Sequence, residues 1–276
     1  MQTYLVASAA YPIPDIPAAA RALVDACGGS LGDRTVQLRR CRGIIADNLP
    51  QDHAQKMTAA LLQAGCKAWC LPTAAIPALP RPLTAHTLDP RDPAHLSAQI
   101  HFSGPPELLQ WTHIAAVLPA RWQMTSRVDE KVAPKRPTMG ATMLDVAMTG
   151  GMRTMLASRT AQKTGKQIET VQNDAMVEIV ALQPLRRVHA FASRMDHGPL
   201  EGRGVQGADN WKLLLQALHD RTRPTTVGRE LLEAAIRGED SPPMLHISDQ
   251  NDLGRTMRWL MILATLERMA AKRAGV

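Results

Sequence analysis

The hydrophobic pattern of roughly the first seventy residues switches between two periods. A period of two, which is typical of strands, predicts strands over Thr3–Ala9, Thr35–Arg40, Gly43–Ala46 and Lys67–Leu71. The second and third of these ranges form either two short strands or one bent strand. Helical spacing predicts helices over Ala18–Cys27 and Gln51–Ala64. The resulting order β-α-β-β-α-β is the split βαβ, or ferredoxin-like, arrangement. We therefore expect residues 1–72 to form a ferredoxin-like unit.

The pattern changes after this unit. Prolines gather in residues 73–94, which we expect to be a linker. Beyond it, the pattern predicts strands over His95–Phe102 and Trp111–Trp122, and a hairpin of Ala175–Leu182 with Val188–Ala192. Helical spacing predicts helices over Met139–Thr160, Asp209–His219, Arg229–Ile236 and Gln250–Lys272. Residues 95–276 are thus expected to form a small antiparallel sheet with C-terminal helices, which makes the whole chain α+β.

The composition indicates a globular chain and limits the cellular compartments in which we expect it. Hydrophobic residues make up 45% of the 276 positions, whereas aromatic residues make up only 3%. The core must therefore be built from aliphatic side chains and from methionine, of which there are 14. No apolar run approaches the roughly 18–20 residues that span a bilayer, and Met1–Tyr11 lacks the pattern of a signal peptide. We expect a cytoplasmic protein with reduced cysteines.

Charge is concentrated in residues 131–166. The chain carries a net charge of +7, and this segment has seven basic residues opposed only by Asp145. Its methionines recur at helical spacing around Gly150 and Gly151, and this pattern favours an ordinary helix that packs its methionines on the core between solvated basic loops. The alternative is a basic amphipathic segment that binds a protein partner, a membrane surface or a nucleic acid. The candidate partner-binding residues are Lys131, Lys135, Arg136, Met143, Met152, Arg153, Met155 and Arg159.

Two other partner classes are compatible with the basic charge, but the sequence favours them less. Nucleic acid is disfavoured because stacking aromatic residues do not alternate with the basic ones, and no helix-turn-helix, RRM or KH signature occurs. An anionic membrane surface would attract the same basic segment, although no transmembrane segment is expected. A protein partner is the leading expectation.

A glycine motif occurs before the helix expected at Asp209–His219. Residues 202–207 spell G-x-G-x-x-G, the pattern that brings a pyrophosphate to a helix N-terminus in dinucleotide sites. That chemistry requires an apolar strand directly before the glycines, and residues 195–201 have loop character. A flexible loop is therefore favoured, and Arg203 leaves open an anion-binding loop of another kind. The candidate ligand-binding residues are Asp196, His197, Gly202, Arg203, Gly204 and Gly207.

The cysteines and histidines do not form a recognisable metal or catalytic motif. Cys66 and Cys70 would share one face of a strand, and Cys41 would lie beside them if two strands pair. Zinc needs four ligands, so buried inert thiols are favoured. His95 and His101 are expected on one strand face but have no carboxylate at a fixed spacing. We expect no metal and no cofactor, and the sequence identifies no catalytic residue.

Three short segments carry a resemblance. They are Leu109–Ala115, Asp209–Leu214 and Arg258–Leu260, and in them the chain resembles uncharacterised proteins of GC-rich bacteria of the planctomycete and myxobacterial type. The resemblance implies no activity. The leading expectation is a non-catalytic regulatory or protein-interaction module. The alternative is an enzyme or sensor that binds an anionic small molecule, such as a nucleotide or a phosphorylated metabolite, at residues 202–207.

Overall fold

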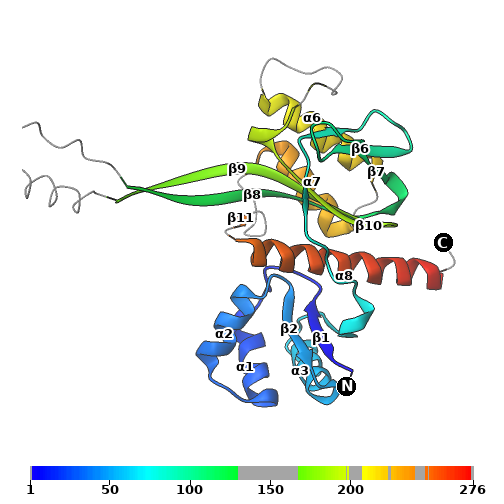
Figure 1. The fold of residues 1–276 in the computed structure, drawn as a ribbon. Helices are drawn as coiled ribbons and strands as arrows, with labels where there is room; N and C mark the ends of the chain where they lie inside the picture. The colour runs from blue at the N-terminus through cyan, green and yellow to red at the C-terminus, as the bar shows by residue number, and fades with distance from the viewer. Residues whose placement is uncertain are drawn as a thin grey trace, which may run out of the picture. The chain divides into compact units, whose positions relative to one another are not determined.

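The computed structural model describes residues 2–129, 167–196, 198, 207–222, 225–239, 246–247 and 249–274 (Figure 1). The chain separates into two compact units. The larger contains Met1–Trp122 and Asp174–Val276, and the smaller contains Gln123–Asn173. Nearly all of the described residues belong to the larger unit, whose three sheets and six described helices confirm the α+β class.

A three-stranded antiparallel sheet opens the larger unit, with strand order β2-β1-β3. Its strands are β1 (Tyr4–Ser8), β2 (Ile44–Leu49) and β3 (Ala68–Pro72), and its helices are α1 (Ile16–Cys27), α2 (Leu31–Arg40) and α3 (Gln51–Gln63). Because β1 lies antiparallel to both neighbours, β2 and β3 run parallel with β1 between them, and α3 connects them as a split βαβ. The three helices share a core with one face of this sheet.

The strand expected at Thr35–Arg40 is wrong, because these residues belong to α2. Ser30 caps the helix by accepting a hydrogen bond from the Asp33 backbone N–H at 3.0 Å. Leu38 is fully buried whereas Val36 is 49% exposed, so their alternation reflects two sides of a helix. The order is therefore β-α-α-β-α-β. The unit has three strands, and the four-stranded ferredoxin-like arrangement is not confirmed.

The centre of the larger unit is a five-stranded sheet of order β11-β8-β9-β10-β4. Its strands are β4 (Leu83–Thr84), β8 (Ile114–Asp129), β9 (Gln167–Leu182), β10 (Leu185–Phe191) and β11 (His246–Ile247). A smaller antiparallel sheet contains β5 (Thr87–Asp89), β6 (His95–Gln99) and β7 (Glu107–Gln110). Three 3-10 turns complete this part: η1 (Thr73–Ala75), η2 (Trp111–His113) and η3 (Ala192–Arg194). The expected hairpin of β9 and β10 is confirmed.

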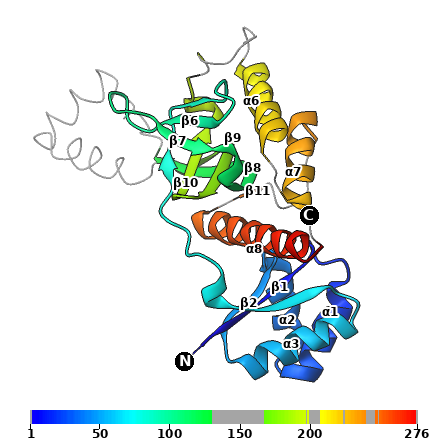
Figure 2. The same cartoon turned by 90° about the vertical axis from the view of Figure 1, so that its right-hand side faces the viewer.

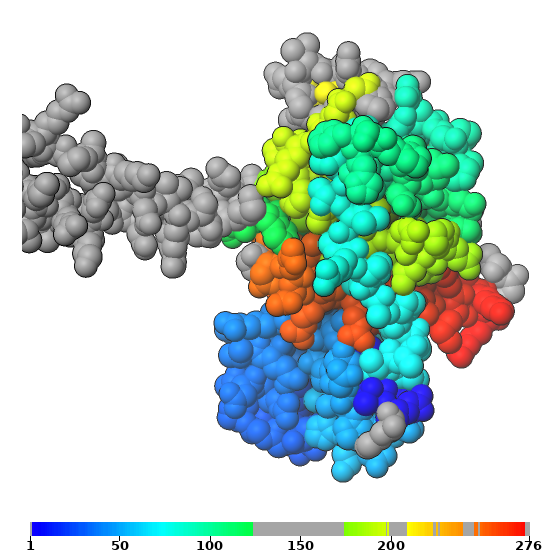
Figure 3. Space-filling view, viewed as in Figure 1, coloured from blue at the N-terminus to red at the C-terminus, as the bar shows by residue number. Residues whose placement is uncertain are grey.

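The residues expected as a linker, 73–94, carry structure of their own. They contain η1, β4 and β5, and β4 pairs in parallel with β10 at the edge of the central sheet. In Figure 3 the cyan chain of this region runs across the orange and red helix α8 (Gln250–Ala274) on its way from the N-terminal sheet to the central one. The segment therefore ties the two sheets together.

Helix α8 lies between the N-terminal sheet and the central sheet, as both ribbon views show (Figures 1 and 2). Its buried stripe shares one core with both sheets. Trp259 is fully buried, and its indole Nε1 donates a hydrogen bond to the Ser8 carbonyl at 2.7 Å. Gly43 lies against the Trp259 ring at φ +82°, and a Cβ there would come within 2.3 Å of the ring. Only glycine permits this approach.

The other face of the central sheet is covered by α6 (Gly207–Arg221), α7 (Thr226–Arg237) and the smaller sheet. Successive side chains of β9 point to opposite faces of the sheet, so the strand contributes to both cores. Met176 and Val180 pack with α8, whereas Val177 and Ile179 pack with α6 and α7. Both helices were expected from the sequence, and Gly238, in the left-handed conformation, follows the last residue of α7 as its C-cap.

Candidate functional site

The glycine-rich loop is only partly inside the described residues. Asp196 is described, and its backbone N–H donates to the His86 carbonyl at 2.8 Å. Its carboxylate accepts a hydrogen bond from the Gly198 N–H at 2.9 Å, so it supports a local turn. Gly207 is the first residue of α6. The other candidates lie outside the described residues: His197, Gly202, Arg203 and Gly204.

The glycine motif follows no strand directly within the described residues. Strand β10 ends at Phe191, and it is followed by η3 and by Met195 and Asp196, which belong to no helix or strand. A dinucleotide site needs the glycines to connect a strand directly to a helix. The loop character expected for residues 195–201 agrees with the described part of this connection.

The partner-binding candidates lie outside the described residues as well, and so does the helix expected at Met139–Thr160. These candidates are Lys131, Lys135, Arg136, Met143, Met152, Arg153, Met155 and Arg159. The structure does show which strands precede and follow these residues. The basic segment connects β8 to β9, and each of these strands is 16 residues long.

A hollow of about 730 Å³ lies beside the C-terminal half of α8. It carries two guanidinium groups and two hydroxyl groups on a partly apolar wall. Its lining residues are Pro93, Trp111, Thr112, Ile114, Ala115, Arg221, Thr225, Ala264, Glu267, Arg268 and Ala271. The N-cap of α7 is one of them, because the Thr225 hydroxyl accepts from the Gly228 N–H at 3.0 Å. This end of the helix adds positive potential to the hollow.

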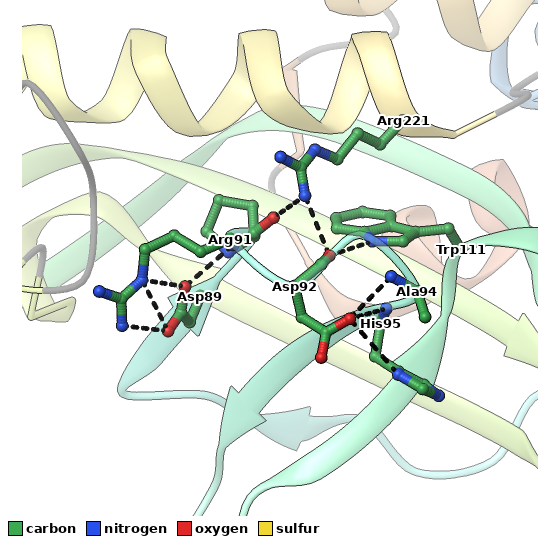
Figure 4. A network of polar contacts seen from close by, with 8 residues as sticks. Asp89, Arg91, Asp92, Ala94, His95, Trp111 and Arg221 are labelled. Atoms are coloured by element: carbon green, nitrogen blue, oxygen red, sulfur yellow. Dashed lines mark hydrogen bonds and ion pairs between the residues drawn. The ribbon is translucent and has the colours of Figure 1, made fainter.

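The guanidinium of Arg221 is held in place at the edge of this hollow (Figure 4). Its Nη1 donates to the backbone carbonyls of Pro90 and Asp92, the second at 2.9 Å. The Trp111 indole donates to the same Asp92 carbonyl at 2.9 Å, and the Arg221 guanidinium lies 5.8 Å from the centre of the Trp111 ring. The Arg221 guanidinium is thus positioned by the turn that contains Pro90 and Asp92 and by the Trp111 ring, without any ligand.

The turn that holds Arg221 is itself stabilised by its aspartate. The Asp92 carboxylate accepts hydrogen bonds from the backbone N–H groups of Ala94 at 2.7 Å and His95 at 3.1 Å. The hydrogen bond from Ala94 is the main reason why the pKa of Asp92 is lowered. The carboxylate therefore stays ionised and keeps its two backbone donors, which fixes the carbonyl that Arg221 and Trp111 share.

A second hollow, of about 320 Å³, adjoins the first. Both are lined by Ala115, Ala264 and Arg268, so these residues form the boundary between them. The second is mostly apolar. Its remaining lining residues are Ala75, Pro77, Leu182, Met261, Thr265, Met269 and Lys272. Arg268 makes no hydrogen bond or ion pair with any residue that the structure describes, so its guanidinium is available at this boundary.

A third hollow, of about 610 Å³, lies where β2, η1 and α8 meet. Its cation, Arg258, forms an ion pair with Asp47. The Asp47 carboxylate also accepts from the Thr73 hydroxyl at 3.3 Å. Its charged groups are therefore used to join α8 to the N-terminal sheet, and the hollow offers less to a ligand than the first two.

Strands β9 and β10 carry a buried polar cluster that the sequence analysis missed. Glu178 is 0% exposed and Arg187 is 8% exposed, and the two form an ion pair. His189 lies opposite Glu178 in the strand pairing, and its Nε2 is 2.7 Å from the Thr84 hydroxyl of β4. One Glu178 oxygen and the His189 Nδ1 are buried and have no hydrogen-bond partner among the residues that the structure describes. The cluster borders none of the three hollows.

Burial sets the protonation of this cluster. Burial raises the pKa of Glu178, against the opposing effect of Arg187. Burial, together with charge repulsion from Arg187 and Arg194, lowers the pKa of His189 to about 4. His189 is therefore neutral at pH 7. A lone carboxylate within the apolar run of residues 175–182 was the signal that could have revealed the cluster.

The cysteines do not form the constellation that was considered. Cys66 precedes β3 rather than lying on it, so it shares no strand face with Cys70. Cys41 and Cys66 are buried, and burial raises the pKa of their thiols, which keeps them protonated. Among the described residues, histidine, cysteine and carboxylate side chains gather in no group that would hold a metal. Likewise β6 ends at Gln99, so His101 lies beyond the strand that carries His95.

Comparisons of the chain with protein-family models, curated proteins and solved structures found no match. Within the described ranges, none of the helices is both long and apolar enough to cross a bilayer.

Proposed function

We propose that this protein is a non-catalytic interaction module that binds an acidic protein partner through residues 131–166. The observation that supports the proposal is the length of β8 and β9. Only Ile114–Trp122 and Asp174–Leu182 of these strands belong to the larger unit, and the rest belong to the smaller one. The basic segment is thus connected to the larger unit by two long paired strands.

The neighbours of β8 and β9 change along their length. Within the larger unit, β11 pairs with β8 at Arg121 and Trp122, and β10 pairs with β9 from Met176 to Leu182. Along residues 123–129 and 167–173, no third strand from the described part of the chain pairs with β8 or β9. A two-stranded ribbon is marginally stable alone, and its free edges readily pair with another chain. A partner that pairs with an edge of this ribbon would stabilise it by supplying a further strand.

Charge selects the kind of partner. Residues 131–166 carry seven basic side chains and one acidic one. A surface of this sign attracts acidic partners, accelerates their encounter and makes binding sensitive to salt. The five methionines of the segment add adaptable apolar contacts. The proposed partner is therefore a protein with an acidic surface around an apolar patch.

A charge-matched pair of variants tests this proposal. The first replaces Lys131, Lys135, Arg136, Arg153 and Arg159 by Gln. The control replaces exposed arginines that make no side-chain hydrogen bond or ion pair in the described residues: Arg21, Arg39, Arg40, Arg81 and Arg229. Partners are identified by quantitative affinity purification with the full chain, and their binding to both variants is then measured with purified components.

The first variant should weaken binding of the partner by at least about tenfold, which corresponds to about 1.4 kcal/mol, and should flatten its salt dependence. The control should bind like the wild type. Equal losses in both variants would mean that only net charge matters, and unchanged binding in the first variant would remove the segment from the interface. Either result contradicts the proposal.

A further inference from the structure

We propose that the two adjoining hollows beside α8 bind one small amphiphilic anion, with a carboxylate or phosphate head and an unbranched aliphatic tail. The inference is independent of the partner-binding proposal. It rests on three observations: one hollow is cationic, its neighbour is apolar, and Arg268 lines both. Each hollow has a volume within the usual range of small-molecule sites, about 300–1,000 Å³.

The first hollow offers donors for an anionic head. Arg221 uses its Nη1 for the carbonyls of Pro90 and Asp92, and its other nitrogen atoms make no hydrogen bond with the described residues. Arg268 has all its donors free within the described structure. Two guanidinium groups and the Thr112 hydroxyl around one space suit a carboxylate or a phosphate, which accept paired N–H groups.

One acidic group limits the charge of the head. Glu267 lines the same hollow and already interacts with another residue. Its carboxylate opposes the positive potential of the two arginines, so a head with a single negative charge is favoured over a polyphosphate. This distinguishes the site from a nucleotide pocket, for which a series of cations or a glycine-rich phosphate loop would be expected.

The second hollow offers an apolar wall for the tail. Leu182, Met261 and Met269 line it together with Pro77. Met269 lies on the last turns of α8 and is 50% exposed. Methionine adapts its side chain to irregular apolar ligands, and a bound tail would cover this exposed surface. Lys272 at the same hollow keeps the local charge positive.

Quenching of Trp111 fluorescence tests the position of the head. Trp111 lines the first hollow and not the second. The probes are two dodecanoates, one brominated beside the carboxylate and one brominated at the far end of the tail, used below their critical micelle concentration. The component of the emission that Trp111→Phe removes should be quenched more by the first probe. Equal quenching by both probes, or no saturable binding, would overturn the proposal.

Isothermal titration then separates head from tail. Dodecanoate and dodecyl phosphate should bind, whereas dodecanol and inorganic phosphate alone should bind at least about tenfold more weakly. Arg268→Gln should weaken dodecanoate binding by a similar factor, and Arg273→Gln should not, because Arg273 is exposed on the same helix and lines neither hollow. Met269→Gln should weaken dodecanoate but not butanoate.

Each contrary result refutes a particular part of the proposal. If dodecanol binds as tightly as dodecanoate and Arg268→Gln has no effect, the arginines do not recognise a head. If inorganic phosphate binds as tightly as dodecyl phosphate, the tail contributes nothing. Because Arg268 is exposed and has no partner in the described structure, its replacement leaves folding intact, and a circular dichroism spectrum identical to that of the wild type verifies this.

Discussion

Glu178 and Arg187 form an ion pair that is almost wholly withdrawn from water, and this makes its energetics testable. Glu178 is 0% exposed and Arg187 is 8% exposed. Replacing Arg187 by Met would leave a buried carboxylate without its counter-ion, while the methionine fills much of the space. Breaking a buried pair in this way costs about 3–5 kcal/mol. We expect Arg187→Met to lower the free energy of unfolding at pH 7 by that amount, measured by urea denaturation.

The neighbouring residue provides a matched control. Arg186 pairs with Glu107 at 3.3 Å, and both side chains of that pair are about 40% exposed. Exposed pairs contribute about 0–1 kcal/mol, so Arg186→Met should have a small effect. The double variant Glu178→Leu with Arg187→Met removes both buried charges and should recover most of the loss.

The pH dependence supplies the refuting result. Burial already raises the pKa of Glu178 in the folded protein, and removal of Arg187 takes away the group that opposes this rise. A carboxyl with a raised folded pKa destabilises the fold as pH increases through that value. The loss caused by Arg187→Met should therefore shrink between pH 7 and pH 4. A loss below about 1 kcal/mol that does not vary with pH would refute the reasoning.

Three further predictions follow from other parts of the molecule. Gly43→Ala should destabilise by roughly 1–3 kcal/mol in urea unfolding, because its Cβ would meet the Trp259 ring; an unchanged midpoint would contradict that packing. The pKa of His189 is about 4 in the folded protein, below its value in the unfolded chain, so protonation of His189 favours unfolding. Stability should therefore fall as the pH drops from about 6.5 towards 4, and thermal melts of His189→Gln should show a smaller fall. A thermal-shift screen with nucleotides and phosphorylated metabolites tests the alternative of an anion-binding loop at residues 202–207. That alternative requires a stabilisation of about 2.7 kcal/mol at a ligand concentration a hundred times the dissociation constant, lost in Arg203→Ala, whereas we expect no shift, which would dispose of it.

Local patterns predicted those elements whose sequence signals agree with their burial. Helix α8 has apolar residues at helical spacing, and Leu253, Met257 and Leu260 are all buried. Helix α7 has a glycine at its C-terminal end in the conformation that glycine favours. In these cases the local preference and the tertiary environment point to the same structure, so the prediction from sequence succeeds.

The errors have physical causes as well. At α2, two apolar residues two positions apart suggested a strand, while the stronger signal was the Ser30 cap followed by Asp33. The candidate ligand site escaped prediction because Arg221 and Arg268 are distant in sequence and line one hollow only in the folded chain, where the C-terminal half of α8 lies near the end of α6 and the N-cap of α7. No local pattern encodes such a meeting. By contrast, the isolated Glu178 in an apolar run was a readable sign of a buried polar group.

The position of α8 has a consequence for how the protein is made. The second face of the N-terminal sheet is covered by α8, and the hydrogen bond from Trp259 to Ser8 joins residues 251 positions apart. At roughly 5–20 residues per second, a ribosome needs about 13–50 s to reach Trp259 after Ser8 has been synthesised. During that interval the apolar side chains of Leu5, Ala7 and Ile44 have no α8 to cover them. The nascent chain therefore keeps this apolar face of the sheet uncovered until the last helix has been translated.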